Sequence, residues 1–224
     1  MNKILLIILI ICGMFSTQII AKTVQPKIVE GNVTLGRSVW FNIEGDRGIV
    51  KVNPIKSGPI TWRIEFTSKG WTTPSANDYA DSQAIYTKER GLVITSGEHL
   101  SFIAKIDVPV DQPLKLNQGS GSIVIGKFTG EIIGKLKVGR LTYDASDLPE
   151  DTCIKTVVEQ GNSTNEWKND PFCENARVKL YVHIGHLKVE RTETSDDQKN
   201  IDPIATGHIY QTGSAIRPKM KSYD

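Results

Sequence analysis

Apolar and polar residues alternate with a period of two along most of the chain. The alternation is clearest in three stretches, residues 60–66, 100–110 and 176–184. Successive side chains of a β-strand point to opposite faces, so this pattern places one face on a core and the other in water. Shorter apolar runs lie between Gly, Pro, Asn and Asp residues that are typical of turns. The chain is therefore predicted to consist of many short strands, with one short helix within residues 75–88.

Strands of this length with turn signals at regular intervals favour an all-β fold. We expect an antiparallel immunoglobulin-like β-sandwich or barrel with short loops. The alternation ends near Thr192, and the polar, charged residues 192–224 are predicted to form a loosely ordered C-terminal extension. The predicted division is a signal peptide at residues 1–21, a β-rich domain at 22–191 and the extension at 192–224.

The alternation changes phase within Val182–Lys188. Apolar residues occupy even positions up to Ile184 and odd positions from Leu187 onward. A shift of one residue is typical of a β-bulge, which we expect at Gly185. His183 and His186 are then both expected on the polar, solvated side of the strand. The tetrapeptide HIGH also matches a signature of the class I aminoacyl-tRNA synthetases, but the pattern here lacks the alternating strands and helices of their nucleotide-binding domain.

The N-terminus predicts export. Lys3 precedes the apolar run ILLIILIICGMF, which is followed by polar residues and Ala21. This is the order of regions in a secretory signal peptide. The run is short for a membrane span and no later segment is apolar enough, so no transmembrane span is expected. The mature protein is predicted to pass through the periplasm and to reach the cell surface or the medium.

Removal of the signal peptide leaves two cysteines, Cys153 and Cys173. An even pair in an oxidising compartment favours a disulfide, and two cysteines without a neighbouring histidine are too few ligands for zinc. The four histidines and the acidic run near Asp196 lack the spacing of known metal sites, so we expect no metal and no cofactor. The formal net charge of +2 is spread along the chain, which indicates no nucleic-acid partner.

Signatures of nucleophilic catalysis such as GxSxG do not occur, so we expect no catalytic residues and no enzymatic activity. A Ser–His–Asp arrangement built from distant segments, and with it an exported hydrolase, stays open. The candidate binding residues are Trp71 and Trp167, which lie in polar loop sequence. An exposed indole suits carbohydrate or protein recognition because its flat ring gives a large contact area. The alternative is a ring that folds over the edge of the core.

The alternating strands, the Cys153–Cys173 pair and the extended segment 22–35 resemble, in architecture, the subunits and adhesins of chaperone–usher fimbriae of enteric bacteria. In that family an N-terminal strand completes the incomplete sandwich of a neighbouring subunit. The resemblance implies a role in cell attachment and virulence, with other fimbrial subunits and a periplasmic chaperone as partners. The residues that it implies for a donor strand are Val24, Ile28, Val33 and Leu35.

The chain departs from the fimbrial pattern in two respects. The cysteine pair comes late in the sequence, and the C-terminal segment around Tyr223 does not alternate. One alternative is that residues 22–35 form an ordinary first strand within a closed domain. Another is a secreted, toxin-like module that binds a host glycan or host receptor through the loop tryptophans.

Overall fold

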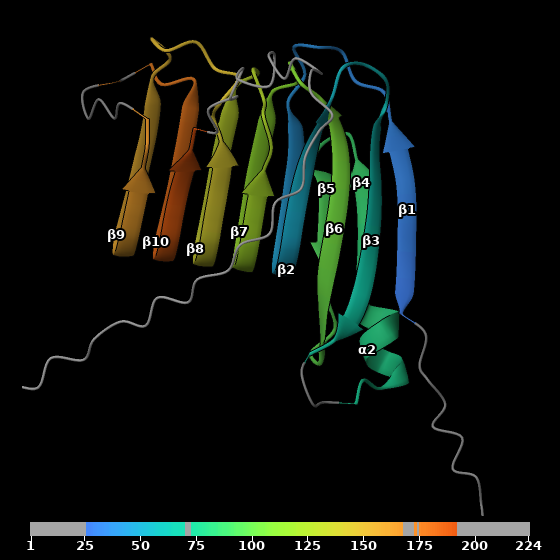
Figure 1. Ribbon diagram of the computed structural model, residues 1–224. Coiled ribbons are helices and arrows are strands. Elements are labelled where there is room, and N and C mark those ends of the chain that lie inside the picture. The colour runs from blue at the N-terminus through green and yellow to red at the C-terminus, as the bar shows by residue number, and fades with distance from the viewer. Residues whose placement is uncertain (1–25, 70–72, 168–172, 174, 192–224) are drawn as a thin grey trace, which may run out of the picture. The chain divides into compact units, whose positions relative to one another are not determined.

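The computed structural model describes residues 26–69, 73–167, 173 and 175–191 (Figure 1). These residues form ten strands and one short helix, with the bounds β1 Lys27–Val33, β2 Phe41–Ile55, β3 Ile60–Ser68, α2 Ala76–Asp81, β4 Gln83–Thr87, β5 Gly91–Thr95, β6 Leu100–Pro109, β7 Leu114–Ile125, β8 Ile132–Asp144, β9 Ile154–Asn165 and β10 Val178–Glu190. The prediction of an all-β fold with one short helix is confirmed. The described part of the chain contains no helix of the length and apolar character that a membrane span requires.

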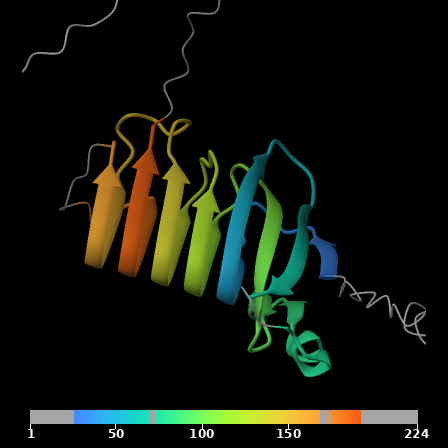
Figure 2. The ribbon, with the colours of Figure 1, turned by 60° about the horizontal axis from the view of Figure 1, so that its bottom comes forward.

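The strands join in one sheet with the order β1-β3-β6-β2-β7-β8-β10-β9, while β4 and β5 pair beside the first half of β2. Figures 1 and 2 show β2, β7, β8, β10 and β9 side by side in this order. The expectation of an antiparallel immunoglobulin-like sandwich is wrong. All pairs from β2 to β9 are parallel, as are the pairs of β2 with β5 and β6. Antiparallel pairs occur between β1 and β3, β3 and β6, and β4 and β5.

The parallel pairing requires the strands to bend. Leu114 of β7 lies beside Ile132 of β8, yet only residues 126–131 connect the end of β7 to that point. A straight strand of 12 residues would rise about 36 Å. The seven peptide units from Ile125 to Ile132 reach about 25 Å at most. The two ends of β7 must therefore come close together, as they do in the coils of a β-solenoid.

A row of glycines forms the corner at which these strands bend. The register aligns one glycine from each of five strands, in the order Gly48, Gly121, Gly139, Gly185 and Gly161. Four of them have a positive φ, for example +136° at Gly139 and +140° at Gly185. We call these five residues the glycine row. In each of the five strands, the residues before the glycine form the first arm and the residues after it form the second arm. L-residues with a side chain rarely adopt such a φ, so glycine is what allows the corner.

The corner also explains the change of phase that the sequence shows. In β10 the buried residues nearest to the glycine are Val182 before it and Leu187 after it, so both arms turn apolar side chains to one core. The expected β-bulge at Gly185 is wrong, because β10 and β8 keep the same register on both sides of the glycine. A bulge inserts an unpaired residue. Here every strand of the parallel row bends at the same level and no residue is inserted.

At the other end of the sheet a turn replaces the glycine corner. The first arm of β2 pairs with β5, and its second arm pairs with β6, so residues 96–99 take the place of the corner. The side chain of Asp46 accepts hydrogen bonds from the backbone N–H of Ser96, at 2.9 Å, and from its hydroxyl group. The strands β3 and β4 then continue the two arms in the antiparallel direction, and β1 closes the edge.

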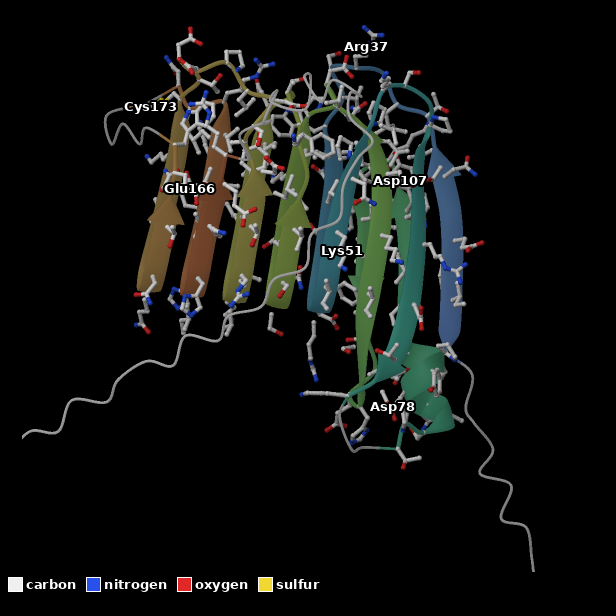
Figure 3. The ribbon with its side chains drawn as sticks, in the orientation of Figure 1. Arg37, Lys51, Asp78, Asp107, Glu166 and Cys173 are labelled. Atoms are coloured by element: carbon white, nitrogen blue, oxygen red, sulfur yellow. A yellow bond between two sulfur atoms is a disulfide. The ribbon has the colours of Figure 1, made fainter. Side chains whose placement is uncertain are left out.

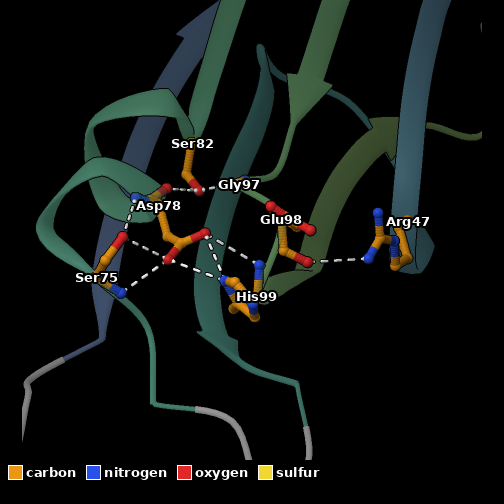
Figure 4. A network of polar contacts seen from close by, with 7 residues as sticks. All are labelled: Arg47, Ser75, Asp78, Ser82, Gly97, Glu98 and His99. Carbon is orange, nitrogen blue, oxygen red and sulfur yellow. Dashed lines mark hydrogen bonds and ion pairs between the residues drawn. The ribbon is translucent and has the colours of Figure 1, made fainter.

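Asp78 clamps helix α2 to this turn (Figure 4). Its buried carboxylate accepts hydrogen bonds from the backbone N–H of His99, at 3.0 Å, and from the hydroxyl and backbone N–H of Ser75, both at 2.7 Å. These bonds favour the ionised form, and they hold the pKa of the Asp78 carboxyl far below its usual range. The hydroxyl of Ser82 donates to the Asp78 carbonyl and accepts from Gly97 N–H, which ties the other end of the helix to the same turn.

The lowered pKa of Asp78 predicts how the fold responds to acid. A depressed carboxyl pKa contributes stability that is present above the unfolded value, about 4, and is lost as the pH falls toward the folded value. Asp78→Asn should therefore lower the urea midpoint at pH 7, and the gap to the natural protein should shrink at pH 3. The exposed Asp81 of the same helix is the control, and Asp81→Asn should leave both midpoints unchanged. If the urea midpoints of Asp78→Asn and the natural protein differed by the same amount at both pH values, the ionised Asp78 carboxylate would not stabilise the fold.

Candidate functional site: a lysine face on the first arms

The register arranges the outward side chains of the first arms in rows across β7, β8, β10 and β9. The row beside Ile133 contains three lysines, Lys115, Lys179 and Lys155. The next row places Lys135 beside Tyr181, and the third places Lys137 beside the corner. All of these side chains are exposed or half-buried. We call this surface the lysine face, made up of Lys115, Lys135, Lys137, Lys155, Lys179 and Tyr181.

Tyr181 lies in the middle of the lysine face. The Nζ atom of Lys135 is 5.9 Å from the centroid of its ring, a cation–π contact. Val157 of β9 is the register neighbour of Tyr181 on its other side. A shallow hollow of about 580 Å³ extends over Tyr181, Lys135, Lys137, Lys179 and His183. The ring therefore forms a half-buried platform with cations around it.

The lysines of the lysine face outnumber the carboxylates near them, which are Glu159 and, in a hollow beside Lys115 and Lys135, Glu44 and Glu89. Glu159 is the carboxylate among the outward residues of these four first arms, and it already contacts His183, with 2.5 Å between its Oε2 atom and Nδ1. Among the residues that the structure describes, none of the five lysines forms an ion pair. Their charge is therefore left to act on solvent and on whatever approaches the face.

The outer face of the second arms of the same strands is different. It carries Arg140 and Lys188 together with the carboxylates Asp144, Glu166 and Glu190. Lys188 lies 2.6 Å from Glu190, and the hydrogen bond and the negative charge of that partner raise the pKa of Lys188. Cations on this side are balanced by anions, so the two outer faces of the bent sheet differ in charge. His186 lies on this side and His183 on the other, and both are exposed as the sequence predicts.

The structure corrects the prediction of an exposed ring at Trp167. Only 5% of this residue is exposed, and it belongs to the hydrophobic core. Its Nε1 donates to the carbonyl of Thr152 at 2.8 Å, and the Arg191 guanidinium lies over the ring, 5.3 Å from its centroid. The loop tryptophan folds over the end of the core, which is the alternative given above. Trp71 lies outside the described residues.

The predicted donor strand completes the sheet of its own chain. Residues 27–33 form β1, which pairs with β3 over its whole length. Ile28 is 44% exposed, while Val33 and Leu35 pack against the core. Val24 lies outside the described residues. For this segment the structure therefore agrees with the alternative of an ordinary first strand.

Cys153 and Cys173 lie at disulfide distance, with their Cα atoms 6.2 Å apart, as the sequence predicts. Cys153 immediately precedes β9. Figure 3 shows Cys173 at the β9 end of the sheet and Asp78 at the opposite end. A cross-link at this position constrains the last strand of the parallel row.

The cluster at α2 contains the residue types of a hydrolytic triad, but not the arrangement. The Ser75 hydroxyl donates to the Asp78 carboxylate, and the His99 ring nitrogen Nδ1 lies 3.3 Å from the same carboxylate. In a triad the serine donates to the histidine, which takes its proton. In this cluster the Ser75 hydroxyl donates to the carboxylate and caps the helix, and the His99 ring contacts the carboxylate instead of the serine. The described residues also contain no group of three or more His, Cys, Asp or Glu side chains placed to hold a metal ion.

The lysine face was missed by sequence reasoning, although two short signals point to it. Lys135-Leu-Lys137 and Lys179-Leu-Tyr181 place polar, charged side chains on one side of two strands. At least 41 residues separate these two segments in the sequence. They form one surface only because β10 lies beside β8 in the sheet.

No protein-family model and no curated protein matches this chain. Among solved structures, it is similar to a candidate cell adhesion protein from Clostridium sporogenes. The superposition covers 75% of this chain and 100% of the other, with a TM-score of 0.42 and 13% sequence identity.

Proposed function

We propose that the protein is an exported attachment protein, without enzymatic activity, that binds an anionic polymer through its lysine face. The observation that carries the proposal is the group of five lysines that share one face with Tyr181 and form no ion pair with any residue that the structure describes. Attraction between such a cluster and a polyanion is long-range and raises the rate of encounter. The register of the parallel sheet fixes the backbone positions of the lysines, while their flexible side chains can adjust to the ligand.

Export is part of the proposal and has two supports. The first is the order of charged, apolar and polar residues at the N-terminus. The second is the cysteine pair at disulfide distance, since disulfides persist in oxidising compartments. Together they favour a protein that acts at or beyond the cell surface.

Between the two fimbrial roles that the sequence suggests, we favour the adhesin over the structural subunit. A donated strand must leave its own sheet, and β1 pairs with β3 along all seven of its residues. An adhesin needs only an exposed binding surface. The lysine face provides one, whereas Trp167 is buried.

The proposal predicts that reversing charge on the lysine face weakens attachment strongly. In the triple variant Lys135→Glu, Lys137→Glu, Lys179→Glu, we expect the affinity for an immobilised acidic polymer to fall about tenfold or more at 0.1 M salt. Each exposed ion pair contributes roughly 0.5 to 1 kcal/mol, and 1.4 kcal/mol corresponds to tenfold. Surface plasmon resonance over a range of salt concentrations would measure the loss.

A matched control keeps the net charge change and moves it away from the site. Three other lysines are exposed and lie outside the lysine face. Lys51 is on the second arm of β2, Lys56 directly follows that strand, and Lys105 is on β6 beside Lys51. The triple variant Lys51→Glu, Lys56→Glu, Lys105→Glu should retain most of the affinity. If both variants lose binding equally, the net charge of the protein is responsible and the proposed site is wrong.

A further inference from the structure

We infer, on the basis of the proposed function, that the anionic polymer is an acidic polysaccharide. In this inference Tyr181 stacks on a sugar ring, while the surrounding lysines bind its carboxylate or sulfate groups. A tyrosine ring offers a flat apolar surface to the C–H groups of a sugar, and an ammonium group pairs with an anion from any direction. The lysine face places both kinds of group within one shallow hollow.

The spacing of the cations suits a chain that lies flat across the strands. Lys115 and Lys179 belong to one row with Ile133 between them, and strands two apart are separated by about 10 Å. Lys135 and Lys137 lie on one strand, where residues two apart are separated by about 6.6 Å. Tyr181 lies in the next row, on the diagonal between Lys155 of β9 and Lys137 of β8, so one extended chain can contact the ring and a charge on either side of it.

Single-stranded nucleic acid fits the lysine face less well. Proteins that bind it place several aromatic rings along the path of successive bases. The outward residues of the first arms of β7, β8, β10 and β9 include one tyrosine and no phenylalanine, tryptophan or arginine, and the imidazole of His183 is already in contact with Glu159. A single platform suits a polymer in which one stacked ring is enough and the remaining contacts are ionic.

Anionic lipid also fits less well. Proteins that hold a lipid surface through an amphipathic face insert large apolar side chains below the headgroups. On the lysine face, Ile133 and Val157 are half-buried between neighbours. The exposed aliphatic side chains nearest to it, Val138 and Ile184, lie at the corner beside the glycine row.

The test measures binding of the full chain to defined polymers at the same salt concentration. The probes are polygalacturonate for carboxylates, dextran sulfate for sulfates, uncharged dextran, an oligothymidylate and vesicles of phosphatidylglycerol. We expect binding to one or both acidic polysaccharides, with dextran, oligothymidylate and vesicles at least about tenfold weaker. Comparing polygalacturonate with dextran sulfate identifies which anion the lysines prefer.

The variants Tyr181→Ala and Tyr181→Phe separate stacking from charge attraction. Tyr181→Ala should weaken polysaccharide binding about fivefold or more while the dependence of affinity on salt stays the same, because no ionic contact is lost. Tyr181→Phe keeps the ring and should bind like the natural protein. Thermal unfolding checks that both variants fold.

Two results would overturn the inference while leaving the proposed function in place. One is binding to oligothymidylate, also an anionic polymer, that equals or exceeds binding to the polysaccharides. The other is unchanged binding of Tyr181→Ala, which would mean that charge alone attracts the polymer. A natural protein that binds none of the anionic polymers, or that binds vesicles at least as tightly, would instead contradict the proposed function itself, and the inference with it.

Discussion

Replacing Gly139 with alanine is expected to prevent the chain from folding or to reduce its stability severely. A Cβ atom at this position would lie 1.9 Å from the carbonyl oxygen of Gly121, and the residue has a φ of +136°. The contact is with backbone, so relief requires the parallel pairing of β7 and β8 to open. An unfavourable φ of this kind costs about 1–3 kcal/mol by itself. With the clash added, we expect a loss above about 4 kcal/mol, a large part of the total stability of an ordinary domain.

The control for this prediction is Gly36→Ala. A Cβ atom on Gly36 would have the Val39 side chain as its nearest neighbour, at an ordinary contact distance of 3.7 Å, and its φ is not in the positive range. The stability of this variant should stay within about 0.5 kcal/mol of the natural protein. Urea unfolding followed by circular dichroism measures both. Equal midpoints for the two variants would show that the corner does not depend on glycine at this position.

Much of the local structure could be predicted from the sequence because strands have a simple period. The alternation identified β3, β6 and the first half of β10, and the phase change at Gly185 marked a real feature of the chain. Alternation reports which side chains face the core, but it carries no information on the direction of the neighbouring strand. The antiparallel expectation came from short strands with turn signals at regular intervals, and short connections ordinarily join antiparallel strands because parallel strands need long crossovers. Strands that bend at a glycine return with short connections, and this removes the basis for the rule.

The candidate site could not be predicted because it depends on strand order. The chain passes from β8 to β9 and then inserts β10 between them. Tyr181 thereby comes to lie between Lys135 and Val157, which precede it by 46 and 24 residues. In a stack ordered as in the sequence, Tyr181 would have no strand beyond β10 and the lysines would be spread differently. The side-chain types were visible, but the order that gathers them was not.

The tryptophans show the opposite limitation, in which local composition gives a misleading result. Trp167 lies among Ser, Thr, Asn and Glu residues, which is typical of an exposed loop. Its burial depends on contacts with Thr152, which precedes β9, and with Arg191, which follows β10. Tyr181 lies in a strand with strong alternation, where an aromatic residue attracts no special attention. Local sequence therefore pointed to Trp167, which is buried, and gave no sign of Tyr181, which lies on the proposed site.

The buried position of Trp167 predicts that its removal affects stability and leaves binding intact. Trp167→Ala deletes a ring that is 5% exposed, together with its hydrogen bond to Thr152. Large aromatic residues in a core cost about 3–5 kcal/mol when truncated to alanine. Trp167→Phe keeps most of the apolar contact and loses the hydrogen bond, so its loss should be smaller, about 1–2 kcal/mol. Chemical unfolding at pH 7 measures both variants.

Tyr181→Ala completes the comparison, because it should change binding and leave stability nearly unchanged. Tyr181 is half-buried on the outer face of the sheet and adds nothing to the core between the arms. Trp167→Ala, at a temperature where it remains folded, should bind the acidic polymer with the affinity of the natural protein. If Trp167→Ala instead kept its stability and lost binding, the ring would act as a ligand contact, and the site would lie at the disulfide end of the sheet. The two variants thus separate the binding surface on the first arms from the loop that the sequence first suggested.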